Sequence, residues 1–299
     1  MRVILHIGPH KTGTTAIQTF MAANAELLSC RGIRYPIPTD GSHNHHEVAH
    51  AFRQPSLRGP MMTRLRRALD ESASTGCSTF VLSSEMFVEH EIPIHDIVEA
   101  TAGHEVSVLA YLRSPDGLWA SAYSQLVVEP EARRTARIDE DPPPYDCTYS
   151  TVLCKWMHHF RPGTMVLAPF DRTQWPGGSL LRDFLGMAGA QDGLFEECDA
   201  SVIDRNPSLP AVLTEIIRRA NASELMTPQR HSALVARARR LAARLPRERR
   251  RPARLRDGAA RARAFELLEP WLETYRPYYR PGFDDSFLRI APKPGGVNA

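Results

Sequence analysis

The sequence predicts an α/β protein in which helices flank a central parallel sheet of about five strands. Three observations indicate this class. Short β-branched apolar runs recur up to Pro169, segments with helical periodicity separate them, and strand signals then stop. The separations are long enough for the crossover connections that parallel strands need. A mostly helical part, over about residues 205–299, is therefore expected to follow the sheet.

The five expected strands are apolar runs that end at glycine, proline or polar residues. They cover residues 3–7, 32–37, 79–82, 106–112 and 165–169. The expected helices cover 16–28, 43–52, 61–73, 91–102, 116–128, 151–160, 179–187, 210–221, 227–245 and 259–275. The charged, proline-rich stretch 129–145 is expected to form an exposed loop. Because no flexible linker separates sheet from helices, we interpret 1–299 as a single domain.

The composition is that of a globular protein, with 42% hydrophobic and 24% charged residues. This excludes a disordered chain, a collagen-like fibre and a disulfide miniprotein. The formal charge of +3 gives no reason to expect a nucleic-acid partner. One segment is strongly basic. Between Arg230 and Arg263 the sequence contains 13 arginines and only two acidic residues, Glu248 and Asp257. We interpret it as a solvated, arginine-rich helix pair; binding to an anionic glycan, a membrane surface or nucleic acid is the alternative.

The cysteines and the N-terminus indicate a location. There are five cysteines and no Cys-x-x-Cys pair, which argues against a disulfide framework or a zinc ribbon. No charged-then-apolar leader precedes the first strand, and no apolar run approaches the roughly 18 residues of a membrane-spanning helix. We therefore expect a cytoplasmic protein without a transmembrane segment.

The strongest local signal is GPHKTGTT, residues 8–15, between the first expected strand and helix. A glycine-containing turn that opens a helix presents backbone N–H groups to an anion, and the helix dipole favours negative charge there. The spacing of Gly8 and Gly13 is that of a Walker A loop, but Thr14 stands where that loop has its lysine. The loop is thus P-loop-like without being a nucleoside triphosphatase loop. Its candidate ligand-binding residues are His10, Lys11, Thr12, Gly13, Thr14 and Thr15.

A second anion-binding element follows the fourth expected strand. Arg113 ends that strand, and Ser121 lies in the helix that comes next. The carboxyl ends of parallel strands line the ligand crevice of such a sheet. A guanidinium group and a hydroxyl at this place can bind one more phosphate.

The two elements PHKTGTT and YLRSPDGLWASAY together resemble the PAPS-dependent sulfotransferase family, where PAPS is 3′-phosphoadenosine 5′-phosphosulfate. The resemblance covers roughly residues 2–220 in outline and is specific at these two elements. It implies a P-loop NTPase-like sheet, with the first loop on the 5′-phosphosulfate and Lys11 at the bridging oxygen. It assigns the 3′-phosphate to Arg113 and Ser121. It also implies an alcohol or phenol acceptor, a carbohydrate or small natural product, with no metal required and adenosine 3′,5′-bisphosphate as product.

The general base is expected at the end of the third strand, where the sequence reads Ser83-Ser84-Glu85. Many members of the family carry a lysine and a histidine there, and this chain departs from that pattern. Glu85 occupies the corresponding place, and glutamate bases occur among carbohydrate-modifying members. The alternative for Glu85 is a helix-start residue that complements the dipole.

A histidine cluster at His43, His45, His46 and His50 supplies the rival base, of which His46 is the candidate. The cluster can also bind the acceptor, and a metal site at His46 and His50 is a minor option, because the spacing lacks a distant third ligand. Two other functions stay open. One is a nucleotide-dependent kinase, which would require magnesium, and the other is a non-catalytic nucleotide- or polyanion-binding module.

Overall fold

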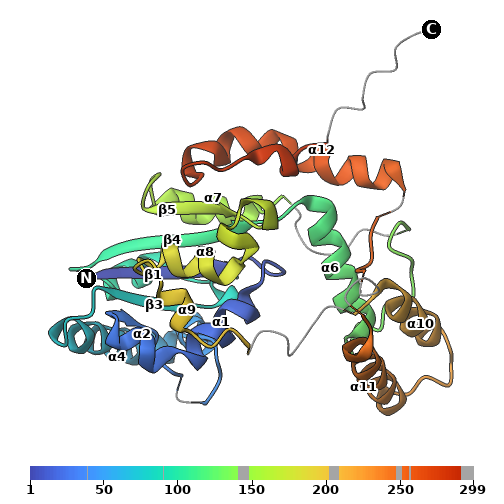
Figure 1. Cartoon of the computed structure of the whole chain (residues 1–299), viewed down its shortest axis with the longest axis horizontal. Coiled ribbons are helices and arrows are strands. Elements are labelled where there is room, and N and C mark those ends of the chain that lie inside the picture. The colour runs from blue at the N-terminus through green and yellow to red at the C-terminus, as the bar shows by residue number, and fades with distance from the viewer. Residues whose placement is uncertain are drawn as a thin grey trace, which may run out of the picture. The chain divides into compact units, whose positions relative to one another are not determined.

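The computed structural model describes residues 1–38, 40–89, 91–140, 148–201, 209–246, 251–255 and 257–290. It confirms the predicted class, with a parallel five-stranded sheet in the order β2-β3-β1-β4-β5 (Figure 1). The strands are β1 (Arg2–Gly8), β2 (Ile33–Arg34), β3 (Thr79–Ser83), β4 (Glu105–Leu112) and β5 (Met165–Pro169). Four strands agree with the expected positions, whereas β2 is much shorter than the expected run 32–37 because only two of its residues pair with β3.

The chain divides into two compact units. The first contains Met1–Arg113, Tyr149–Ile203 and Trp271–Asp285, and it holds the whole sheet. The second contains Ser114–Thr148, Asp204–Pro270 and Ser286–Ala299. The interpretation of the chain as a single domain stays a prediction.

The central strand of the sheet is β1, and its sequence explains the position. Its residues from Val3 to Gly8 are all buried, as expected for a parallel strand covered on both faces. β1 pairs with β3 on one side and with β4 on the other. The loop after β1 therefore emerges between the carboxyl ends of β3 and β4, where binding sites of parallel sheets form.

One face of the sheet is covered by α1 (Thr14–Ala23), α2 (Ala25–Cys30), α8 (Leu180–Met187) and α9 (Leu194–Glu197). Ile4, Val81 and Tyr111 point from the strands into this core and meet Phe20 and Phe184 from the helices. The expectation of one helix over 16–28 was wrong, because the chain breaks at Asn24. The Asn24 amide donates to the Phe20 carbonyl at 2.9 Å and so caps the end of α1.

The other face carries α3 (His46–Arg53) and α4 (Pro55–Ser74). α5 (Ile94–Ala100) packs against α4, and α7 (Ser150–His159) packs against α5. Phe80 and Leu82 point to this side, where they share a small cavity wall with Val48 and Leu65. Two expected boundaries were wrong. α4 begins at Pro55, where proline at the first helical position starts the helix before residue 61, and α5 begins only at Ile94, after Pro93.

The described part of the second unit is helical. It contains α6 (Pro115–Val128), α10 (Ala211–Asn221), α11 (Pro228–Arg244) and most of α12 (Gly258–Tyr275). These match the expected helices closely. Short 3-10 turns complete the fold: Glu85–Val88, Arg172–Gln174, Pro176–Gly178, Arg276–Tyr278 and Asp285–Leu288. Residues 141–145 of the expected loop and residues 202–208 of the range 2–220 lie outside the described residues. Within the described ranges, no helix combines the length and the apolar character needed to cross a membrane.

Candidate functional site

The loop after β1 has a backbone that only glycine fits at two positions. Gly8 has a φ of +93°, and a Cβ there would lie 3.3 Å from Glu85 Cβ. Gly13 has a φ of +79°, and a Cβ there would lie 2.4 Å from Leu180 Cδ2 and 3.0 Å from Phe170. Both positions lie in the left-handed region that disfavours side chains. The glycine spacing noted in the sequence therefore reflects the shape of the loop and its close contact with the residues around it.

The first turn of α1 presents N–H groups at the end of this loop. Gly13 is the N-cap residue and has no side chain to satisfy them, and the first turn contains no acidic residue. Thr14 is buried and Thr15 is exposed. Thr12 plays a different part, because its hydroxyl donates to the Pro9 carbonyl at 2.5 Å. This hydrogen bond fixes the shape of the loop, and the fully buried Thr12 side chain is not available to a ligand.

The two cations of the first unit's candidate site lie at adjacent strand ends. Lys11 has a φ of +67° in the loop, and its carbonyl accepts a hydrogen bond from Arg113 Nη1 at 2.7 Å. The Arg113 guanidinium also lies over the Phe170 ring, 5.2 Å from its centroid. Arg113, at the end of β4, is thereby attached by its side chain to the loop that follows β1. Ser121 lies half-buried in α6 of the second unit, and its predicted role stays a prediction.

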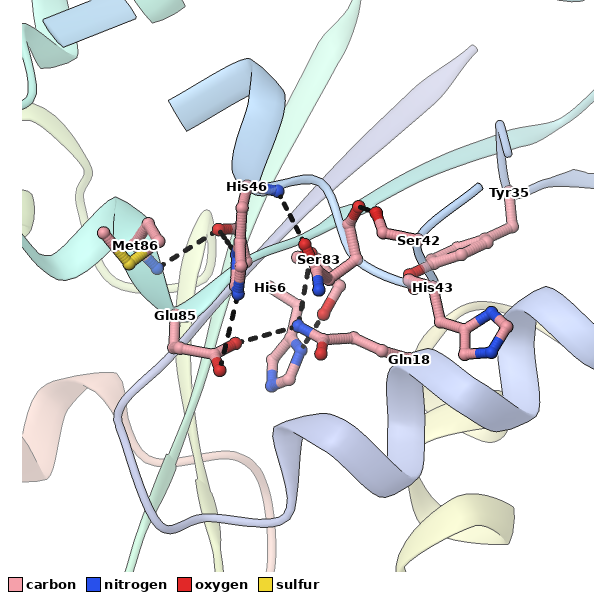
Figure 2. A network of polar contacts seen from close by, with 11 residues as sticks. His6, Gln18, Tyr35, Ser42, His43, His46, Ser83, Glu85 and Met86 are labelled. Carbon is pink, nitrogen blue, oxygen red and sulfur yellow. Dashed lines mark hydrogen bonds and ion pairs between the residues drawn. The ribbon is translucent and has the colours of Figure 1, made fainter. Parts of the chain in front are cut away.

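A carboxylate stands on the opposite side of the loop. Glu85 begins the 3-10 turn after β3, and its side chain is 17% exposed. Glu85 Oε2 accepts a hydrogen bond from Gln18 Nε2 of α1 at 3.0 Å, while Oε1 lies 3.7 Å from His46 Nε2 (Figure 2). The structure therefore brings the two candidate bases, Glu85 and His46, to one place. It also places Glu85 at the start of a helical turn, as the alternative interpretation expected.

His46 is held from its other ring nitrogen. Its Nδ1 lies 2.7 Å from Ser84 Oγ, and that hydroxyl accepts the Met86 N–H at 3.1 Å (Figure 2). When the Ser84 hydroxyl donates to Nδ1, the neutral imidazole carries its proton on Nε2, facing Glu85. In this tautomer His46 supports the carboxylate, and Glu85 Oε1 remains able to accept a proton.

His45 has a structural role. The Ser83 N–H donates to His45 Nδ1 at 3.0 Å, so the ring proton resides on Nε2, which donates to the Pro36 carbonyl at 2.8 Å. Burial lowers the pKa of His45 to about 4, although the hydrogen bonds to Pro36 and Ser83 act in the opposite direction. Because both ring nitrogens are committed to the backbone, His45 cannot take a proton from an acceptor hydroxyl.

Two further histidines flank the site. His6 is fully buried in β1, with Nδ1 2.8 Å from Ser83 Oγ and a pKa lowered by burial to about 4. His10, in the loop, has its pKa lowered chiefly by burial, with Glu85 and Glu89 acting to raise it. A lowered pKa keeps both rings neutral near pH 7. The histidines from His43 to His50 do not form one cluster of interacting side chains. His45 and His46 bind the partners described above, and His50 contacts Gln54.

Gln18 is the site residue that the sequence analysis missed. It is buried on α1 between apolar neighbours and donates to Ser83 O at 3.3 Å as well as to Glu85. Because both partners are acceptors, the amide nitrogen must face them. A signal was present, since a polar side chain on an otherwise apolar helix face needs a partner.

Comparisons with known proteins add little to this geometry. No family model matches the chain, and no solved structure matches it. A protein from Archaeoglobus fulgidus, described as an uncharacterized protein, is 29% identical over 152 residues, which are 50% of this chain and 40% of the relative. The chain thus spans well under two thirds of that relative's length.

Proposed function

We propose that this chain is a sulfotransferase that moves a sulfuryl group from PAPS to a hydroxyl of a carbohydrate or small natural product. The observation that supports the proposal best is the closeness of an anion-binding loop and a carboxylate. Gly8, at the start of the loop, lies so near Glu85 that a Cβ at Gly8 would be 3.3 Å from Glu85 Cβ. Sulfuryl transfer needs these two parts, a cationic cradle for the donor and a base for the acceptor.

The cradle consists of Lys11, the first turn of α1 and Arg113. When bound, PAPS supplies a sulfuryl group whose bond to the 5′-phosphate oxygen breaks, with its electron pair leaving on the phosphate, as the acceptor oxygen bonds to sulfur. Lys11 stabilises the charge that grows on the departing oxygen, and the N–H groups of α1 bind the phosphate beside it. Arg113, held over Phe170, binds the second phosphate with its guanidinium fork.

The base is Glu85. Its Oε2 is occupied by the Gln18 amide, which leaves Oε1 to take the proton of the acceptor hydroxyl. His46 Nε2, 3.7 Å from Oε1, stabilises the carboxylate before the transfer. A fixed carboxylate reduces the rearrangement needed to reach the transition state.

Turnover with PAPS and a panel of sugars and phenols tests the proposal, with release of adenosine 3′,5′-bisphosphate as the readout. The proposal expects release that depends on the acceptor and is lost in Glu85→Gln. Phosphoryl transfer from ATP–magnesium, with none from PAPS, would replace the proposal by the kinase alternative. Tight binding of the bisphosphate without any transfer would leave a nucleotide-binding module.

A further inference from the structure

The second unit contains an open cavity of about 790 Å³. All the residues that line it belong to this unit. They come from α6, the segment 137–139, the start of α10 and the segment 251–255. A volume of this size is typical of sites for small organic ligands. The sheet-end site of the first unit contributes none of these residues.

Part of the cavity wall is apolar. Tyr123, Ile138, Val212 and Leu255 contribute rings and branched side chains. Tyr123 and Leu255 are fixed in the packed core of the unit, whereas Val212 is 70% exposed. Contact between this apolar wall and the apolar part of a ligand removes both surfaces from water, which favours binding. Because Val212 is exposed, a ligand can pack against its side chain without disturbing the packing of the core.

The charged part of the wall is basic. Four arginines line the cavity against two carboxylates, Asp139 and Glu215. Glu215 is already paired with Arg218 at 2.7 Å and with Arg219, one of the four, at 2.8 Å, and the hydrogen bond from Arg218 is the main reason that the pKa of Glu215 falls to about 2. The remaining arginines of the wall are Arg137, Arg251 and Arg254. Within the described ranges, their guanidinium groups have no hydrogen-bonding or ion-pair partner.

The N-terminus of α10 opens at the same cavity. The Ala211 N–H donates to the Arg251 carbonyl at 2.8 Å, which fixes the segment 251–255 against the helix. No described backbone carbonyl accepts from the next two N–H groups, those of Val212 and Leu213. N–H groups at a helix start favour an anion.

Tyr123 adds a neutral donor. Its side chain is 4% exposed, and no described residue is hydrogen-bonded to its hydroxyl. Burial raises the pKa of Tyr123, so the phenol keeps its proton at neutral pH. A ligand in the cavity can therefore accept a hydrogen bond from this phenol.

We infer that this cavity binds a small organic anion, namely an apolar ring system that carries a sulfate or carboxylate group. The oxyanion pairs with Arg251 and Arg254 near the start of α10, and the ring system lies against Val212 and Leu255. The inference does not depend on the function proposed for the first unit. A concave, partly apolar wall fits a compact ligand better than a polyanion, which would follow exposed charge.

Calorimetry on the full chain tests this inference with 2-naphthyl sulfate, 2-naphthoate and uncharged 2-naphthol. The anions should bind at one site per chain, and 2-naphthol should bind at least tenfold more weakly, since a charge-assisted hydrogen bond contributes roughly that factor or more. Whichever anion binds more tightly identifies the group that the cavity takes. Equal binding of all three would overturn the inference.

Variants distinguish the cavity from general surface charge. The double variant Arg251→Ala/Arg254→Ala should weaken binding of the two anions by roughly tenfold or more. Val212→Glu should do the same by repulsion, and because Val212 is exposed it leaves the fold intact, as the melting temperature would show. The matched control is Arg240→Ala, an exposed arginine of α11 outside the cavity, and Lys11→Ala controls for the loop of the first unit. Equal losses in Arg240→Ala, or anion binding unchanged in Val212→Glu, would contradict the inference.

Discussion

Gln18 Nε2 lies 3.0 Å from Glu85 Oε2, so a side chain of α1 holds the carboxylate that follows β3. The same helix begins at the anion loop, with Gly13 as its N-cap. One rigid element therefore sets both the place of the proposed anion-binding turn and the direction of the candidate base. A site assembled in this way needs little adjustment when its ligand arrives.

Glu85→Gln should reduce turnover by roughly two to four orders of magnitude, the usual contribution of a general base. The amide keeps the size of the side chain and can still accept from Gln18, but it cannot take a proton. Affinity for adenosine 3′,5′-bisphosphate should stay nearly unchanged, as measured by calorimetry. Glu89→Gln, four residues along the chain, is the control and should remain active. An active Glu85→Gln together with an inactive His46→Ala would move the base to His46.

Lys11→Ala should lower turnover by a larger factor than it lowers affinity for the bisphosphate. The lysine charge matters most when the bridging oxygen becomes anionic, and that happens in the transition state. Steady-state kinetics and calorimetry on the same variant give the two factors. If Lys11→Ala retained full turnover with every acceptor, Lys11 would have only a structural role in the loop.

Gly13→Ala should destabilise the protein and abolish bisphosphate binding. The substitution combines a positive φ with a Cβ 2.4 Å from Leu180 Cδ2. Gly41→Ala is the matched control, since its φ is +73° but nothing lies within 4 Å of the added Cβ. The control should lose only the backbone contribution, roughly 1–2 kcal/mol. Equal losses of unfolding free energy in both variants would show that the contact with Leu180 is unimportant.

Stability should fall as the pH drops from about 6.5 towards 4. Burial holds the pKa of His45 and of His6 at about 4, below the ordinary value of 6.5. Between these values the unfolded chain binds protons that the folded chain does not, so acid favours unfolding; below about 4 this contribution levels off. Thermal unfolding of His45→Gln should therefore depend less on pH than that of the parent chain.

Much of the fold and part of the site could be predicted from the sequence. The loop of residues 8–15 was recognisable because the glycine spacing and the first helical turn are local features. Arg113 was recognisable as a candidate because it directly follows a strand whose last five residues, 108–112, are apolar and buried. Both signals depend on neighbours along the chain, which a sequence displays directly.

The rest depended on which strands are neighbours. Gln18 contacts Glu85 because β1 and β3 are neighbours in the sheet. The order of strands in a sheet cannot be predicted from local sequence patterns. Sequence alone did not show the surroundings of His45 and His46: the Ser83 N–H commits His45 to the backbone, and Ser84 directs His46 to Glu85. These roles follow from distances between segments about 40 residues apart, where composition carries no information.

Binding of adenosine 3′,5′-bisphosphate and of AMP, compared by calorimetry in the parent chain and in Arg113→Ala, tests the central claim most directly. The claim is that the crevice between β1 and β4 holds a nucleotide with a second phosphate. The account predicts that the parent chain binds the bisphosphate at least tenfold more tightly than AMP, since a guanidinium–phosphate contact contributes at least that factor. It also predicts that Arg113→Ala removes most of this difference. Equal affinities for the two nucleotides in the parent chain would contradict the account.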